Sequence, residues 1–322
     1  MPYSRDKRVF EECVKWLSGP PSLHATACVN GRRILDTTEP GQQLFQALLA
    51  DCLFSRHRSH PWDQMKGRSF SELLSYFGWV CPLPDRLVIC TNTPARIANY
   101  LLPYTNVFGP GSFEHSGIPG LRVVACRRRA IDLVHLPTGG RLELLDPQKN
   151  RHSTPRDMRR TLRLELEMHR DWREEEVGRS PVWRSEELTR EERAAEPAWQ
   201  WAPSTNLRSA MMARAGLFWS TSYHESEFRL ARRSDSALLL MWREGRTTTE
   251  MGELLTGRAV GIPGAQFELP PAEYAPGVLR LGGTAMEILG PERPKLVTAL
   301  RRARLPKSRH GRSSATTVLS GS

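Results

Sequence analysis

Long apolar runs are absent from this 322-residue chain, and the longest, such as 237–242, fall far short of the roughly 20 residues that a membrane-spanning helix needs. Charged residues fill the first stretch, Met1–Arg8, where a secretory signal would place an apolar segment. We therefore expect no signal peptide and no contact with a membrane, and we predict a soluble, intracellular protein.

Cysteine is scarce and unevenly placed, with six residues that all lie in the first 126 positions. No two of them form a Cys-x-x-Cys pair, which excludes a zinc ribbon, and their number is too low for a dense disulfide framework. The sequence predicts reduced thiols that are mostly buried, and we expect no cofactor.

Lysine is also rare in a chain with a strong positive charge. Lys and Arg total 46 against 35 Asp and Glu, a net charge of +11, yet only six of the basic residues are lysine, which leaves 40 arginines. The planar guanidinium group forms paired hydrogen bonds to phosphate oxygens and stacks on bases. This bias favours a nucleic-acid partner, although a GC-rich genome that simply encodes arginine often would give the same composition.

Apolar periodicity predicts an α+β fold that is mostly helical and has two lobes. Helices are expected at 5–17, 39–54, 69–76, 94–102, 205–219 and 294–305, with a further helix from Pro155. Short β-branched and leucine-rich runs predict a strand at 86–90 and a small antiparallel meander near 121–145. An extended oligomerisation loop is expected at about 226–255.

The same patterns suggest a division of the chain. We expect an N-terminal mixed lobe with a basic RNA-binding surface at 1–170, and an acidic linker with a short helix at 171–204. A C-terminal helical lobe would follow at 205–305, and residues 306–322 predict a disordered basic tail.

Acidic residues on and after the predicted hairpin raise the alternative of a metal-dependent nuclease. Asp132, Glu143, Asp146 and Lys149 have the chemistry of such a site, but the usual Glu-x-Lys spacing is missing. A nucleotidyltransferase is weaker still, because Ala130 stands where the first of two paired aspartates would be.

A zinc site is a second candidate, since Cys52, His57 and His60 could supply three ligands. The sequence offers no fourth ligand nearby, so a buried thiol beside two polar histidines is the favoured interpretation. Gly109–Phe113 is rich in glycine but lacks the Gly-Lys-Ser/Thr ending of a phosphate-binding loop.

Basic clusters give a stronger signal. Between Arg122 and Arg170 there are twelve Lys or Arg and six acids, and the triplet 127–129 is hard to bury without partners. With Trp62 available for stacking, these side chains could line a groove for single-stranded RNA, although a scattered solvated surface remains the alternative. The predicted RNA-binding residues are Arg56, Arg58, Lys66, Arg68, Arg122, Arg127, Arg128, Arg129, Arg141, Arg156, Arg159, Arg160, Arg163, Arg301, Arg302 and Arg304.

Several short motifs occur in an order that resembles a known family. They are Val9–Cys13, Ala50–Phe54 with His57, Ser59–Asp63, Arg86–Pro94, Cys126-Arg127 and Thr138-Gly139. Together they resemble the nucleoproteins of segmented negative-strand RNA viruses, of the amnoonvirus type found in tilapia lake virus.

A second stretch resembles the oligomerisation tail loop of influenza-type nucleoproteins. The apolar run Ala237–Trp242 is followed by Glu244–Thr247 and by Glu250-Met251. The resemblance implies that this loop docks into a neighbouring subunit, with Trp242 as its anchor, Arg246 in a salt bridge, and Leu239 and Leu240 in the apolar strip.

The resemblance implies a nucleoprotein that coats single-stranded genomic RNA without sequence specificity, is not an enzyme, and forms homo-oligomers by loop exchange. It also implies contacts with the viral polymerase and host nuclear import factors, in virion ribonucleoprotein and in the nucleus and cytoplasm of the infected cell. A metal-dependent nuclease, or a basic viral structural protein with no direct RNA role, are the alternatives.

Overall fold

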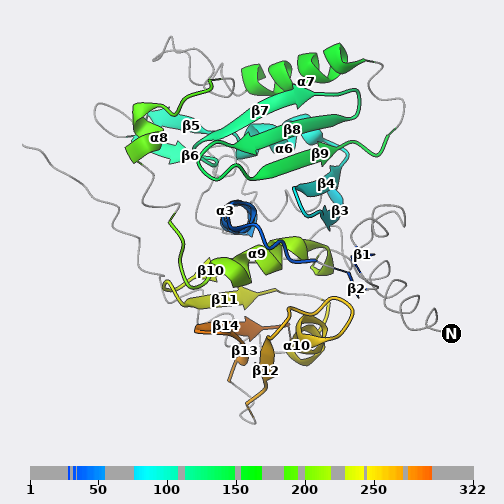
Figure 1. Cartoon of the computed structure of the whole chain (residues 1–322), viewed down its shortest axis with the longest axis vertical. Helices are drawn as coiled ribbons and strands as arrows, with labels where there is room; N and C mark the ends of the chain where they lie inside the picture. Colours follow the sequence, from blue (N-terminus) through cyan, green and yellow to red (C-terminus); the bar gives the residue numbers. More distant parts are fainter. Residues whose placement is uncertain are drawn as a thin grey trace, which may run out of the picture.

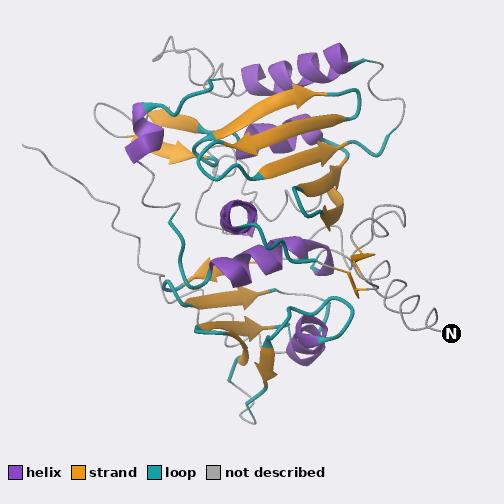
Figure 2. Ribbon diagram, viewed as in Figure 1, coloured by secondary structure: helices purple, strands orange, loops and turns teal. Residues whose placement is uncertain are grey.

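The computed structural model describes residues 28–29, 32–33, 35–54, 76–107, 113–148, 154–168, 185–194, 200–218, 229–242, 245–270 and 275–291. Over this part of the chain the fold is α+β and is dominated by two five-stranded mixed sheets (Figures 1 and 2). The prediction of a mostly helical protein is therefore wrong. No described helix is both long and apolar enough to cross a membrane.

The first sheet has the spatial order β3 (Phe77–Pro82), β4 (Leu87–Thr91), β9 (Arg141–Leu145), β8 (Ala130–His135), β7 (Leu121–Cys126). All neighbours in it are antiparallel except β4 and β9, which run parallel. The three strands of the expected meander are therefore part of a larger mixed sheet. Helix α3 (Pro40–Phe54) precedes this sheet, and α6 (Pro94–Leu101) follows β4 and packs against β8 and β9.

Smaller elements accompany the first sheet. A two-stranded ladder joins β5 (Tyr104–Val107) to β6 (Phe113–Ser116), and a second joins β1 (Cys28–Val29) to β2 (Arg32–Arg33). Two helices follow the sheet in the chain, α7 (Pro155–Met168) and the short α8 (Arg190–Ala194).

The second sheet has the spatial order β10 (Arg229–Arg232), β11 (Ala237–Met241), β14 (Thr284–Leu289), β13 (Gly277–Leu281), β12 (Gln266–Glu268). Here too all neighbours are antiparallel except the second and third strands in space, β11 and β14. Helix α9 (Thr205–Ala213) with the 3-10 turn η3 (Ala215–Leu217) precedes it, and α10 (Thr248–Thr256) follows β11.

The two sheets are copies of one topology. Each is built from a leading helix, a hairpin, a second helix and a three-stranded meander whose last strand pairs in parallel with the second strand of the hairpin. The pairing register also corresponds: Glu143 lies opposite Val88 and Glu287 lies opposite Leu239, each flanked by buried apolar residues. We call α3 through β9 the N-terminal unit and α9 through β14 the C-terminal unit.

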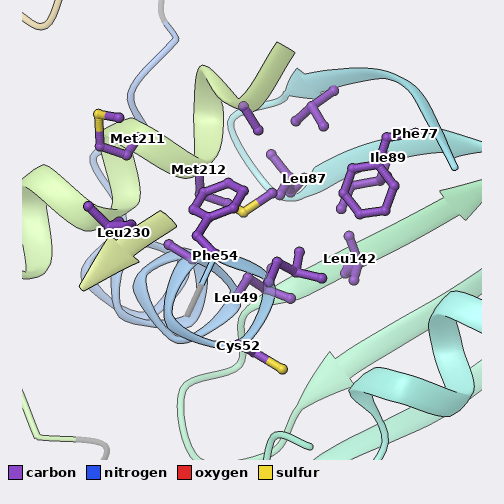
Figure 3. Packing of buried hydrophobic residues seen from close by; sticks show 14 of the residues in the cluster. Leu49, Cys52, Phe54, Phe77, Leu87, Ile89, Leu142, Met211, Met212 and Leu230 are labelled. Atoms are coloured by element: carbon purple, nitrogen blue, oxygen red, sulfur yellow. The ribbon is translucent and has the colours of Figure 1, made fainter. Parts of the chain in front are cut away.

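The leading helices of the two units pack against each other at the centre of the molecule (Figure 1). Side chains from α3, from β4 and β9, and from α9 and β10 form one buried hydrophobic cluster, shown in part in Figure 3. Four cysteines, at positions 52, 81, 90 and 126, are buried free thiols, as the sequence predicts. Burial, followed by the nearby Asp146 carboxylate, raises the pKa of Cys90 to about 12, so this thiol is unreactive.

His135 lies buried where α3 crosses the end of the first sheet. Its ring stacks on Phe45 with centroids 5.5 Å apart, and Nε2 lies 2.9 Å from the Pro119 carbonyl oxygen. Because a carbonyl only accepts, Nε2 carries the proton, and Nδ1 accepts from the Thr138 hydroxyl at 2.9 Å. Burial lowers the pKa of His135 from 6.5 to about 4, so the ring is neutral at pH 7.

This histidine predicts a loss of stability in mild acid. Its folded-state pKa lies below its unfolded-state value, so its contribution is complete above pH 6.5 and is lost as pH falls toward 4. The expected loss is about 3 kcal/mol of unfolding free energy, measured by urea denaturation across this range. His135→Gln should fall less over the same range, and an equal fall in both proteins would contradict this assignment.

Candidate nucleic-acid interface

Helix α7 begins at a reciprocal cap. The Asp157 amide donates to Thr154 Oγ1 at 3.2 Å, and the Thr154 amide donates to Asp157 Oδ2 at 2.9 Å. Pro155 fills the first helical position, where no amide hydrogen is needed. Met158 and Leu162 are fully buried on the inner side of the helix, which packs against α6 and β7. These anchors fix which side of α7 faces solvent.

The solvent side of α7 is strongly basic. Arg156, Arg159, Arg160 and Arg163 are all exposed. Because a helix turns by about 100° per residue, the four side chains fall within about 100° of its circumference, and they span about 10 Å along its axis. Among the ion pairs of the described residues, none involves any of the four. We call these four residues the α7 arginine face.

The triplet after β7 does not act as one cluster. Arg127 forms a two-pronged ion pair with Asp132, at 2.6 and 2.7 Å, and also contacts Glu143 at 3.0 Å. The hydrogen bond to Asp132 raises the pKa of Arg127. Arg129 donates to the carbonyl oxygens of Asp146 and Pro147, whereas Arg128 is exposed. Arg127 and Arg128 are both exposed, but the guanidinium group of Arg127 is already held by two carboxylates.

Arg122 is buried and serves the fold. Its guanidinium group forms a two-pronged pair with Glu192 of α8, at 2.8 and 2.6 Å, and donates to the Ser185 and Glu187 carbonyl oxygens. Only 3% of Arg122 is exposed. Burial alone would raise the pKa of Glu192, but hydrogen bonds from Arg122 and from backbone amides lower it below its usual value. A phosphate could reach this arginine only by displacing the glutamate, so the buried position of Arg122 argues against its predicted contact with RNA.

The other predicted RNA-binding residues are dispersed or undescribed. Arg141 is exposed at the start of β9, on the partly exposed face of the sheet that also holds Asp132 and Glu143. Trp62 and seven basic residues lie outside the described part of the chain: Arg56, Arg58, Lys66, Arg68, Arg301, Arg302 and Arg304. The α7 arginine face is therefore the set that the structure brings together. In Figure 1, the turn that carries Arg128 lies at the same end of the sheet as the start of α7.

Asp132 and Glu143, two acidic residues of the nuclease alternative, form ion pairs with arginines. Asp132 and Glu143 are direct cross-strand partners, but Arg127 binds both carboxylates and Arg86 contacts Glu143 at 3.2 Å. Asp146 is fully buried and accepts from the Gln148 amide. Across the described ranges, no group of three or more His, Cys, Asp or Glu is placed to hold a metal.

Of the remaining residues proposed for the nuclease and zinc sites, the structure describes Cys52. Lys149, of the nuclease set, lies outside the described residues, as do His57 and His60 of the zinc set. Cys52 is buried in the hydrophobic cluster on α3. The favoured interpretation of the sequence predicts a buried thiol beside two polar histidines; the thiol is buried, and the two histidines lie outside the described residues.

The predicted oligomerisation residues pack within their own chain. Leu239 and Leu240 lie in β11, the second strand of the C-terminal sheet, and are at most 1% exposed. The Trp242 Nε1 group donates to the Arg246 carbonyl oxygen at 2.7 Å, and Arg246 donates to the Leu217 carbonyl oxygen at 2.6 Å. The extended loop expected at about 226–255 is therefore wrong, because most of this segment forms β10, β11 and α10.

Because Trp242 is buried within its own chain, its replacement should affect stability and not assembly. Trp242 is 4% exposed and belongs to the central cluster, so Trp242→Ala should lower the unfolding free energy by about 3–5 kcal/mol. Denaturant unfolding measures this loss. A variant of unchanged stability but altered oligomeric state would instead restore the docking role.

The sequence places all four α7 arginines among its candidates but does not separate them from the arginines that serve the fold. Their spacing of three, four and seven residues, on a helix whose Met158 and Leu162 point inward, is the signal that identifies a single exposed face. Comparison of the chain with models of known families, with curated proteins and with solved structures finds no match.

Proposed function

We propose that this chain binds single-stranded RNA through the α7 arginine face, contacting phosphates without reading bases. The observation that carries the proposal is a set of four exposed arginines on one side of one helix, with no ion-pair partner among the described residues. Guanidinium groups bind phosphate oxygens by charge-assisted hydrogen bonds and release condensed counterions. In this role the chain would coat genomic RNA in a viral ribonucleoprotein rather than catalyse a reaction.

The geometry supports contact with the backbone more than with bases. Arginines that follow one helix face over about 10 Å present a row of positive charge, which suits a line of phosphates. Among the described residues, no cluster of exposed aromatic side chains lies beside α7 on which bases could stack, so contact with phosphates, which carry no sequence information, accounts for the binding. Binding should therefore be similar for single-stranded RNAs of equal length and different sequence.

Salt dependence tests the proposal. The logarithm of the affinity should fall linearly with the logarithm of salt concentration, with a slope of about −0.7 for each phosphate neutralised on a single strand. Four contacts predict a slope near −2.8, measured by fluorescence anisotropy with a labelled oligonucleotide. A slope near zero would remove the electrostatic mechanism.

Incubation with labelled RNA and manganese separates coating from the nuclease alternative. Intact RNA after incubation, with protection against an added ribonuclease, is the result expected of a coat protein. Cleavage that needs manganese and is lost in Asp132→Asn would support the nuclease instead.

A further inference from the structure

The interface between the two units is reciprocal. Helix α3 of the N-terminal unit packs against α9 and reaches β10, the first strand of the C-terminal sheet, while α9 packs against α3 and reaches β3, the first strand of the N-terminal sheet. Equivalent elements of the two units thus contact each other in the same pairings. This is the arrangement of a two-fold symmetric dimer, here formed within one chain.

Polar contacts define this interface as well as apolar packing. Asp51 of α3 forms an ion pair with Arg208 of α9, and the Ser209 hydroxyl donates to Gln46 Oε1 at 2.8 Å. Around them, Phe54 of α3 and Met212 of α9 belong to the shared buried cluster (Figure 3). Each leading helix therefore presents an apolar surface that also contains buried polar groups and a charge that its partner complements.

The connection between the units is distinct from the interface. The Arg122–Glu192 pair fastens α8 to β7 of the N-terminal unit. Residues 203 and 204 hydrogen-bond to the C-terminal unit, so the chain between α8, which ends at Ala194, and that unit is residues 195–202, which span at most about 26–29 Å when extended. The side-chain contacts between α3 and α9 would be the same if the two helices belonged to two different copies of the chain.

We propose that a second copy of this chain is a partner for this interface, through exchange of whole units. In the resulting dimer the N-terminal unit of each copy packs on the C-terminal unit of the other, and the α3–α9 contact forms twice. Exchange needs no new surface, because each copy supplies the complementary helix that the other copy lacks while open. This proposal does not depend on RNA binding, and it uses a surface different from the segment 226–255.

The Asp51–Arg208 pair allows a test by charge exchange. Asp51→Arg alone and Arg208→Asp alone each place like charges across the interface within one chain. If the two variants are unfolded, mixed in equal amounts and refolded, both interfaces of an exchanged heterodimer regain opposite charges. Light scattering should then give twice the 36.5 kDa mass of one chain for the mixture and not for either variant refolded alone.

Two controls make the test specific. At a low protein concentration, a chain that carries both substitutions should refold as a monomer, because its own interface is again complementary and the intramolecular contact is favoured on dilution. The pair Arg233–Glu287, at 3.2 Å, lies entirely within the C-terminal unit, so mixing Arg233→Glu with Glu287→Arg at the same low concentration should give no more dimer than either variant alone. A mixture of the Asp51 and Arg208 variants that contains only the species found with each variant alone would overturn the proposal.

The unsubstituted protein gives a second measurement in case the variants do not fold. Two preparations with different affinity tags, refolded together at high concentration, should copurify on either tag as a species of double mass. The same preparations mixed after separate refolding should not copurify. Complete absence of the double-tagged species after joint refolding would contradict unit exchange.

Discussion

Replacing all four arginines of the α7 face by glutamine should weaken single-stranded RNA binding by roughly 10²–10⁴-fold, since each exposed hydrogen-bonded contact contributes a net of about 0.5–1.5 kcal/mol and four are lost. The salt slope should also become less negative by about 2.8, because four phosphate contacts are lost. Anisotropy titrations at several salt concentrations measure both quantities. Glutamine keeps the helix propensity and most of the side-chain length, so α7 should remain folded.

A matched variant separates the site from net charge. Four other exposed arginines, in α8 and in the C-terminal unit, can be replaced by glutamine to give the same change in net charge: Arg190, Arg193, Arg258 and Arg280. This control should lose much less affinity than the α7 variant. Equal losses in the two variants would mean that binding reflects overall charge and not the α7 arginine face.

Arg122→Ala should destabilise the protein by about 3–5 kcal/mol, because it leaves the Glu192 carboxylate buried without its partner. Glu192 would keep its backbone donors at Gly120 and Thr189, but these do not neutralise its charge. Urea denaturation at pH 7 measures the change. In the absence of urea, under conditions where the variant is folded, its RNA affinity should match that of the unsubstituted protein.

The apolar double variant tests the cause of this loss. Arg122→Met with Glu192→Leu removes both charges and keeps similar volumes, so it should recover much of the lost stability. If Arg122→Ala were as stable as the parent protein and instead lost RNA binding, the side chain would have to be exposed to RNA and its buried position would be wrong.

Local sequence patterns predict those elements whose signals are local. The helix at 40–54 follows from a proline in the first turn and a leucine stripe, and the helix at 155–168 follows from its composition despite an alternating Leu pattern. The apolar run at 237–241, in contrast, predicts part of an extended loop. These residues form a strand with neighbours on both sides, β10 and β14, and β14 is more than 40 residues away along the chain.

The roles of individual arginines depend on long-range contacts and could not be predicted. Arg122 meets Glu192, and Arg214 donates to Asp36 at 2.6 and 2.7 Å, across separations that no spacing rule covers. Part of the arginine excess is thus explained by internal ion pairs. The composition of the chain therefore overstates how many arginines are available to a nucleic acid.

The duplication of the topology is also hidden in the sequence. Leu142-Glu143-Leu144 and Met286-Glu287-Ile288 occupy equivalent register positions, yet they share little beyond a glutamate between two apolar residues. Two-residue alternation of this kind is common to most half-buried strands, so it does not reveal a repeat. The common strand order identifies the two units.

Photo-crosslinking of bound single-stranded RNA, followed by mapping of the crosslinked peptides, tests the central claim most directly. RNA bound to the α7 arginine face should give crosslinks concentrated in peptides that contain residues 154–168, and these should disappear in the four-glutamine variant. Crosslinks confined to the C-terminal unit at residues 205–289, unchanged in that variant, would contradict the account.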